Sequence, residues 1–441
     1  MTSGTAEAVK GTAADRRNAR LYLIGLATSM LGDSAMSLVA GIWVKSLTGS
    51  SSLAGLVSAC VYLPSLFGPV GGVIADRVHR QRLLIRLNIA SALVLLGLLA
   101  VRSAAGVWII FVVMTWYGIV LMVTGPAESA LFAEMLPLEI RQRVNGWQLG
   151  LQETGRLVAP LAGAGLFALA GGGVVAAADA ATFAVAAVMT ARLRLRPRDP
   201  QPRAASHWRA DLLAGFAHIG QTPVLRRVLA AGAGVMALSA IVVAAQFSLV
   251  EAVGQRPAFL GVFSAGLGGG SIVASLVSSR VLRRTGEEWL AIFGMFNFAV
   301  GTALRATGML VPALIGTVVL GFALPWVFLA VLNLAQRLTP LSLQGRVSAA
   351  VALAMFGPQA PLQALGSLAI RYASYRQLYL ATAAAALLWA AYLLRPALAT
   401  RKGLVSPGSG VCSRRAERVR GRGQGRSRTR WFRAGREDGH A

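Results

Sequence analysis

Ionisable residues inside long apolar runs are the first candidates for chemistry in this 441-residue chain, because a charge is costly to bury there. Asp33 lies about halfway along the first run. A carboxylate in a low-dielectric cavity can exchange a proton for a cationic substrate, so Asp33 is the leading candidate for a coupling residue. The structural alternative is that Asp33 accepts hydrogen bonds from Ser29 or from a neighbouring helix.

Three further residues are candidates for substrate or proton coupling. Glu128 follows Gly125-Pro126, where a helix kink can open a cavity, although the side chain can also extend toward the membrane surface. Glu153 and Arg156 are three positions apart, so they share a helical face and can neutralise each other. That pair would either hold helices together or contact substrate.

A short charged turn separates the apolar runs 53–75 and 83–101. It contains Gly72, Asp76, Arg77, Arg80 and Arg82. Charges this close together cannot lie in hydrocarbon, and an excess of arginine is typical of loops on the cytoplasmic side. The pattern predicts a short cytoplasmic loop.

The composition favours a membrane protein with many spans. Hydrophobic residues make up 55% of the chain and charged residues only 14%, and the mean hydropathy is +0.61. The formal net charge of +26 does not indicate a nucleic-acid partner, because the basic residues fall in short connections and in the C-terminal tail. The sequence has no phosphate-binding Gly-x-x-x-x-Gly-Lys-Ser/Thr loop and no histidine-cysteine cluster, so we expect no cofactor, no metal and no enzyme activity.

Twelve apolar windows are long enough to cross a membrane. The windows do not show the alternation of polar and apolar residues that is typical of barrel strands. They therefore predict an all-α fold of twelve transmembrane helices in two six-helix bundles. The windows are 20–46, 53–75, 83–101, 106–132, 144–168, 173–191, 226–250, 259–282, 288–306, 311–335, 345–371 and 376–394.

The distribution of arginine predicts that both chain ends are cytoplasmic. The N-terminal stretch lacks the features of a cleaved signal peptide, so we expect the first span to remain in the protein. The expected segments are a cytoplasmic tail (1–19), the first bundle (20–191), a cytoplasmic central loop with a short amphipathic helix (192–225), the second bundle (226–394) and a basic, disordered cytoplasmic tail (395–441).

The two halves of the chain repeat at a fixed offset of 203 positions. Pro137 and Arg143 correspond to Pro340 and Arg346, and the same offset places Arg80 on Arg283. Two loops that agree on one offset indicate a parallel internal repeat.

The charged turn also carries a family resemblance. Its pattern, Gly72-x-x-x-Asp76-Arg77-x-x-Arg80-x-Arg82, resembles the loop signature of the major facilitator superfamily. Gly32-Asp33, Leu63-Pro64 and Asp211-Leu-Leu-Ala-Gly215-Phe216 resemble the branch that holds macrolide and siderophore exporters. Gly155-x-x-x-Ala159-Pro160-x-x-Gly163 is similar to the antiporter motif of drug exporters.

This resemblance implies a monomeric plasma-membrane transporter that exports a small amphipathic compound, such as a drug, an antibiotic or a siderophore, in exchange for protons. It implies that the aromatic residues Trp116, Tyr117, Trp326 and Phe328 lie on helices that line a central cavity. A metabolite importer or facilitator is the alternative within transport, and a non-transporting scaffold or sensor is the alternative from another class.

The repeat and the resemblance together suggest a cytoplasmic gate. We expect Asp76 to cap the helix that begins near Arg346, and Arg80 to pair with Glu134 or Glu139. These contacts would form only while the cytoplasmic side is closed, so they would bias the conformational equilibrium without touching substrate.

Overall fold

The computed structural model describes residues 13–67, 78–136, 138–194, 208–340 and 343–405. Every regular element in these ranges is an α-helix or a short 3-10 helix, as the apolar windows predict. The described residues up to Arg395 form one compact unit, and the described residues from Pro396 on belong to a second unit.

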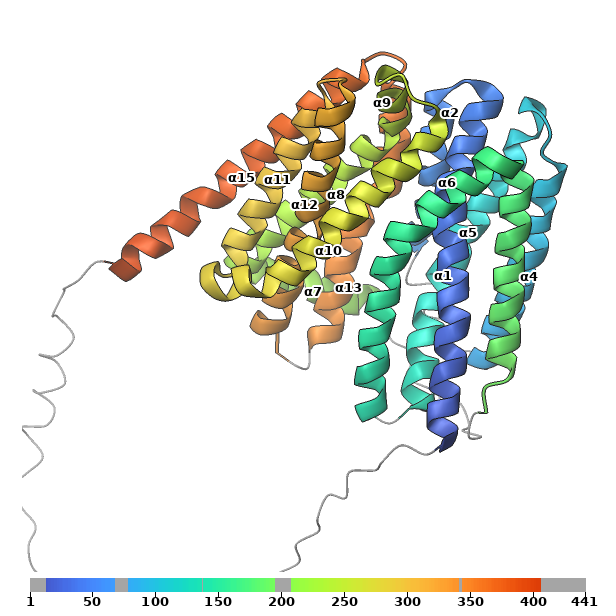
Figure 1. The fold of residues 1–441 in the computed structure, drawn as a ribbon. Coiled ribbons are helices and arrows are strands. Elements are labelled where there is room, and N and C mark those ends of the chain that lie inside the picture. Colours follow the sequence, from blue (N-terminus) through green and yellow to red (C-terminus); the bar gives the residue numbers. More distant parts are fainter. Residues whose placement is uncertain (1–12, 68–77, 137, 195–207, 341–342, 406–441) are drawn as a thin grey trace, which may run out of the picture. The chain divides into compact units, whose positions relative to one another are not determined.

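The first half of the first unit is built from four long helices and several short ones (Figure 1). α1 packs against α6, and α4 packs against both α5 and α6, so these helices form one cluster. The elements are α1 (Ala13–Thr48), α2 (Ser51–Tyr62), η1 (Leu63–Phe67), α4 (Arg80–Leu96), η2 (Gly97–Ala100), η3 (Ala104–Gly106), α5 (Val107–Met135) and α6 (Leu138–Ala191).

The expected windows 144–168 and 173–191 both fall within α6, which is broken at Gly171. Gly171 has φ 78°, a left-handed conformation that glycine adopts without steric cost. In Figure 1 the chain reverses direction between the two parts of α6. Two membrane crossings are therefore joined with almost no loop.

The second half begins with the helix of the central connection, α7, which packs against α13. Gly215 of α7 lies so close to α13 that a Cβ atom would clash with the backbone at Arg346. The elements are α7 (Trp208–Gln221), α8 (Pro223–Ala244), α9 (Gln246–Ala252), η4 (Pro257–Phe259), α10 (Leu260–Thr285), α11 (Glu287–Arg305), α12 (Leu310–Leu338), α13 (Gln344–Phe356), α14 (Gln359–Ala369) and α15 (Tyr375–Val405).

Eight helical segments of the described ranges are long and apolar enough to span a membrane. They are Ala14–Thr48, Arg80–Ala100, Ala104–Glu128, Gly150–Ala191, Pro223–Ala244, Pro257–Thr285, Leu310–Leu338 and Tyr375–Leu394. The difference from twelve windows has local causes. α6 merges two windows, α2 ends shortly before residues 68–77 that are not described, α11 begins on two glutamates, and α13 and α14 divide one window at Gly357-Pro358.

The helix bounds support the internal repeat. α5 (Val107–Met135) and α12 (Leu310–Leu338) are both 29 residues long, and their ends differ by the 203 positions read from the loops. The fold is therefore an all-helical arrangement in which the second half repeats the first.

The two halves meet at one end of the bundle, which we call the Lys45 end (Lys45–Ser52 with Ala244–Glu251 and Ser367). There α2 packs against α8 and α14, and a Cβ atom on Gly55 would lie only 2.6 Å from the carbonyl oxygen of Ala244. Lys45 forms an ion pair with Glu251, and the hydroxyl of Ser52 donates a hydrogen bond to the carbonyl oxygen of Ser367. Nearby, α10 approaches α6 through Gly261.

Candidate functional site

A polar cavity of about 410 Å³ lies among α1, α5 and α6. It contains two of the predicted coupling residues, Asp33 and Glu128. The described lining residues include these two carboxylates and no basic side chain. They are Tyr22, Leu26, Ser29, Met30, Asp33, Leu121, Thr124, Gly125, Glu128, Phe132, Gln148 and Gln152.

Helical periodicity explains how α1 contributes to this cavity. Tyr22, Leu26, Ser29 and Asp33 follow one another at intervals of three or four residues, so they lie along one face of the helix. Tyr22 also packs against Phe132 of α5, with ring centroids 5.0 Å apart. That contact holds α1 against α5 on the N-terminal side of Asp33 and on the C-terminal side of Glu128.

Asp33 has an unsatisfied acceptor. Its Oδ1 atom is buried and has no hydrogen-bond partner. The hydroxyl of Ser29, which could have satisfied it, instead donates to the carbonyl oxygen of Leu26 at 3.2 Å. A buried carboxylate oxygen without a donor is costly, so this atom is a site where a proton or a cationic ligand group would be stabilised.

Asp179 is a functional candidate that was not predicted from the sequence. It is 2% exposed, and its carboxylate accepts hydrogen bonds from Thr182 Oγ1 at 3.0 Å and from the hydroxyl of Tyr117. The only signal in the sequence was a carboxylate within an apolar window, and its partner Tyr117 lies 62 positions away.

Gly32 permits this close approach of α1 and α6. A Cβ atom at Gly32 would overlap the Asp179 carboxylate and would lie 2.5 Å from Thr182 Oγ1. Asp33 follows Gly32 directly in the chain, so it is one position away from the residue that packs against Asp179 and Thr182. The sequence pair Gly32-Asp33 thus combines close helix packing with a cavity carboxylate.

We expect Gly32→Ala to destabilise the protein by about 1–3 kcal/mol, because the added methyl group displaces the buried Asp179 carboxylate. The midpoint of thermal unfolding in detergent measures the effect. Gly165→Ala in α6 is the matched control, since nothing lies within 4 Å of its Cβ position. The control should unfold no earlier than the wild type, and equal losses in both variants would contradict the packing argument.

The four predicted cavity aromatics do not belong to the described lining of this cavity. Three of them use their polar atoms within the helix bundle. Trp116 Nε1 donates a hydrogen bond to Ser91 Oγ at 3.1 Å, and Trp326 Nε1 donates one to the carbonyl oxygen of Ala274 at 3.0 Å. The hydroxyl of Tyr117 donates a hydrogen bond to the carboxylate of Asp179. Phe328 is 39% exposed and packs near Phe356.

Several predicted residues lie outside the described part of the structure. Gly72, Asp76 and Arg77 fall in residues 68–77, and the side chains of Glu134, Glu139, Glu153 and Arg156 are not described although their positions lie in α5 and α6. The expected Asp76 cap and the expected pairs of Arg80 with Glu134 or Glu139 therefore remain predictions.

The other predicted gate residues occupy two helix starts. Arg80 and Arg82 lie in the first turn of α4, where the neighbouring Gln81 donates to the carbonyl oxygens of Thr190 and Leu193 at 2.9 and 3.0 Å. Arg346 Nε donates to Asp211 Oδ1 of α7 at 2.8 Å. The central connection thus supplies a partner for Arg346 that the sequence did not suggest.

Comparisons with known proteins agree on family and fold. A family model described as the Major Facilitator Superfamily matches residues 22–360. The search of curated proteins returned no match. Among solved structures, the chain is similar to the nucleoside transporter NupG, with a TM-score of 0.66, 14% identity and coverage of 87% of this chain and 99% of the other.

Two similar structures were solved in an inward-facing state. One is a bacterial homologue of the iron transporter ferroportin, with a TM-score of 0.65, 16% identity and coverage of 87% of this chain and 99% of the other. The second is a bacterial homologue of the human lysosomal transporter Spinster in an unoccupied conformation. It has a TM-score of 0.65 and 14% identity, and the match covers 90% of this chain and 100% of the other. At these identities the likeness concerns the fold alone.

Proposed function

Because the chain belongs to the Major Facilitator Superfamily, we propose that it is a secondary active transporter that exports a small, amphipathic, cationic compound in exchange for protons. The transported molecule would cross by alternating access, in which the two halves open the site to one side of the membrane at a time. Export, proton coupling and the plasma membrane as the location are parts of this proposal.

The observation that carries the proposal is the buried, unpaired Oδ1 atom of Asp33 in a cavity that also contains Glu128. Two carboxylates in one cavity attract a cation and favour retention of a proton when no cation is present. Competition between the two ligands for the same oxygen atoms is the simplest chemical basis for antiport. Neither ligand then needs a separate binding site.

The rest of the cavity lining suits an amphipathic molecule. Tyr22, Phe132, Leu26 and Met30 offer aromatic and aliphatic contacts, whereas Gln148 and Gln152 offer amide donors and acceptors. A cation near an aromatic face gains further stabilisation. This combination favours an organic cation over a small inorganic ion.

We propose that the cavity faces the cytoplasm in the described conformation. The described hydrogen bonds and ion pair between the halves gather at the Lys45 end, whereas the cavity is lined by the first part of α1, the last part of α5 and the first part of α6. The arginine distribution predicts that this opposite end is cytoplasmic. The inward-facing state of two similar structures agrees with this assignment.

Transport by inverted membrane vesicles tests the proposal. We expect a fluorescent organic cation such as ethidium to accumulate when the vesicle interior is acidified, and to leave when a protonophore removes the pH gradient. Vesicles that contain Asp33→Asn protein are the control. Uptake by intact cells driven by an inward proton gradient would instead establish an importer. If the protein neither binds nor transports any of the tested compounds, the scaffold or sensor alternative is favoured.

A further inference from the structure

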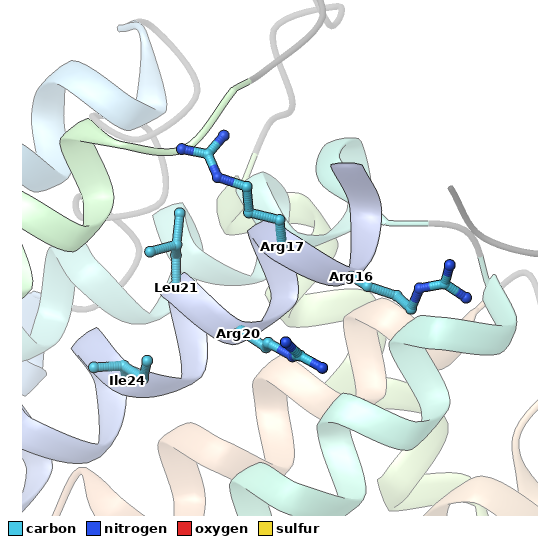
Figure 2. Close-up of a pocket in the computed structure, with 5 residues that line it drawn as sticks. All are labelled: Arg16, Arg17, Arg20, Leu21 and Ile24. Carbon is cyan, nitrogen blue, oxygen red and sulfur yellow. The ribbon is translucent and has the colours of Figure 1, made fainter. Parts of the chain in front are cut away.

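A second cavity, of about 560 Å³, lies at the start of α1 and is separate from the Asp33 cavity. Its described lining consists of Arg16, Arg17, Arg20, Leu21 and Ile24. Figure 2 shows the arginine side chains extending from the first turns of the helix, with Leu21 and Ile24 farther along it. The three arginines are exposed, and Ile24 is 49% exposed.

This surface occupies the side of α1 that faces away from the coupling residues. Arg16, Arg20 and Ile24 follow at intervals of four residues, so they lie along one face. They differ by two positions from Tyr22 and Leu26, which corresponds to roughly 200° around the helix. A ligand bound at this surface would therefore leave the transport cavity free.

The arginines of this surface differ from others at the same end of the bundle in lacking an acidic partner. Arg227 pairs with Glu288 at 3.5 Å, Arg337 with Glu287 at 3.2 Å, and Arg346 with Asp211 at 2.8 Å. Within the described ranges, no carboxylate lies within ion-pair distance of Arg16, Arg17 or Arg20. Asp15 precedes them in α1 and has contacts of its own. Three guanidinium groups thus remain available to an external anion.

The order of polarity along the helix identifies the class of anion. The guanidinium groups come first, and the aliphatic side chains follow in the direction of the membrane-spanning part of α1. A phospholipid has the same order, with phosphate at the membrane surface and acyl chains below it. Guanidinium groups bind phosphate oxygens through paired N–H donors.

We propose that Arg16, Arg17, Arg20, Leu21 and Ile24 form a binding site for an anionic phospholipid. The three arginines bind the phosphate and headgroup, and Leu21 and Ile24 contact the upper part of an acyl chain. The site depends on the membrane location of the chain and not on the nature of its transported substrate.

Native mass spectrometry of the full chain in detergent, titrated with phosphatidylglycerol or phosphatidylcholine, tests the proposal. We expect the variant Arg16→Gln/Arg17→Gln/Arg20→Gln to bind phosphatidylglycerol roughly a hundredfold more weakly than the wild type, since each arginine contributes on the order of a tenfold effect or somewhat less. Phosphatidylcholine should bind weakly to both proteins. The corresponding lysine variant should retain most of the preference for the anionic lipid, because it keeps the three charges.

Arg280→Gln/Arg283→Gln/Arg284→Gln is the matched control. These three arginines are also exposed, lie at the end of α10 and carry the same total charge, but they do not line either of the two cavities described above. The control should bind phosphatidylglycerol as the wild type does. Equal losses in both variants, equal binding of the two lipids, or displacement of phosphatidylglycerol by millimolar inorganic phosphate would each overturn the proposal.

Discussion

Asp33→Asn is expected to abolish proton-driven accumulation of substrate while leaving the protein folded. The substitution keeps the size of the side chain but removes both the negative charge and the exchangeable proton. Oδ1 of Asp33 is buried without a donor, so it is the cavity atom at which proton and cation would compete most directly. Transport in vesicles should fall by roughly tenfold or more and should no longer depend on the pH gradient.

Comparison with two other variants separates charge from structure. Asp33→Glu retains a carboxylate and should retain part of the coupled transport, whereas Glu128→Gln removes the second carboxylate of the same cavity and should weaken cation binding while leaving the dependence on pH. Unfolding temperatures of all three variants establish whether the fold is intact. Wild-type transport with an unchanged pH dependence in Asp33→Asn would exclude Asp33 from coupling.

The contents of the cavity were partly predictable from sequence. Asp33 and Glu128 were identified because carboxylates inside apolar runs are rare, and the periodicity of α1 places Tyr22, Leu26 and Ser29 on the face of Asp33. The contact of Asp179 with Tyr117 could not be predicted, since it joins helices whose relative rotation is set by packing. The pair Gly32-Asp33 and the carboxylate of Asp179 within an apolar window pointed to that region, but neither identified Tyr117 as a partner.

The fold was more accessible to sequence analysis than the contacts between its halves. Apolar windows, the arginine bias and the 203-residue repeat together predicted an all-helical membrane protein, which the helices and the family match confirm. The break at Gly171 falls between the predicted windows 144–168 and 173–191, but the tightness of the reversal was not predicted, because it needs only one left-handed residue. Lys45 falls within the predicted window 20–46, but its burial in the last turn of α1, where it is 7% exposed, was not predicted.

That position of Lys45 leads to a prediction about the conformational equilibrium. Its ammonium group donates to the carbonyl oxygen of Gly49 at 2.6 Å and to Ser51 Oγ at 2.8 Å, and it forms an ion pair with Glu251. The hydroxyl of Ser51 donates to Glu251 Oε2 at 2.9 Å. Glu251 belongs to the second half of the chain, so its contacts with Lys45 and Ser51 exist only while the Lys45 end is closed.

Glu251→Gln is expected to shift the population toward states that are open at the Lys45 end. The substitution leaves a buried ammonium group without its counter-ion in the closed state, and opening returns that group to water. Loss of such a contact corresponds to about 1–3 kcal/mol, or roughly a 5- to 150-fold change in the ratio of the two states. Lys45→Met should have a smaller effect, because methionine fills the buried volume without charge and the half-exposed Glu251 side chain can be solvated.

The distance between spin labels at Ser46 and Ala252 measures this equilibrium, since both positions are exposed and lie on opposite halves at the Lys45 end. The wild type should show mainly the short distance, Glu251→Gln should gain a longer one, and the double variant Glu251→Gln/Lys45→Met should return toward the wild type, because it removes the uncompensated charge. A long-distance population that is as large in Lys45→Met as in Glu251→Gln would mean that the attraction between the two charges, and not the burial of Lys45, holds this end closed. Unchanged distances in every variant would show that the packing of α2 against α14 is sufficient to close it.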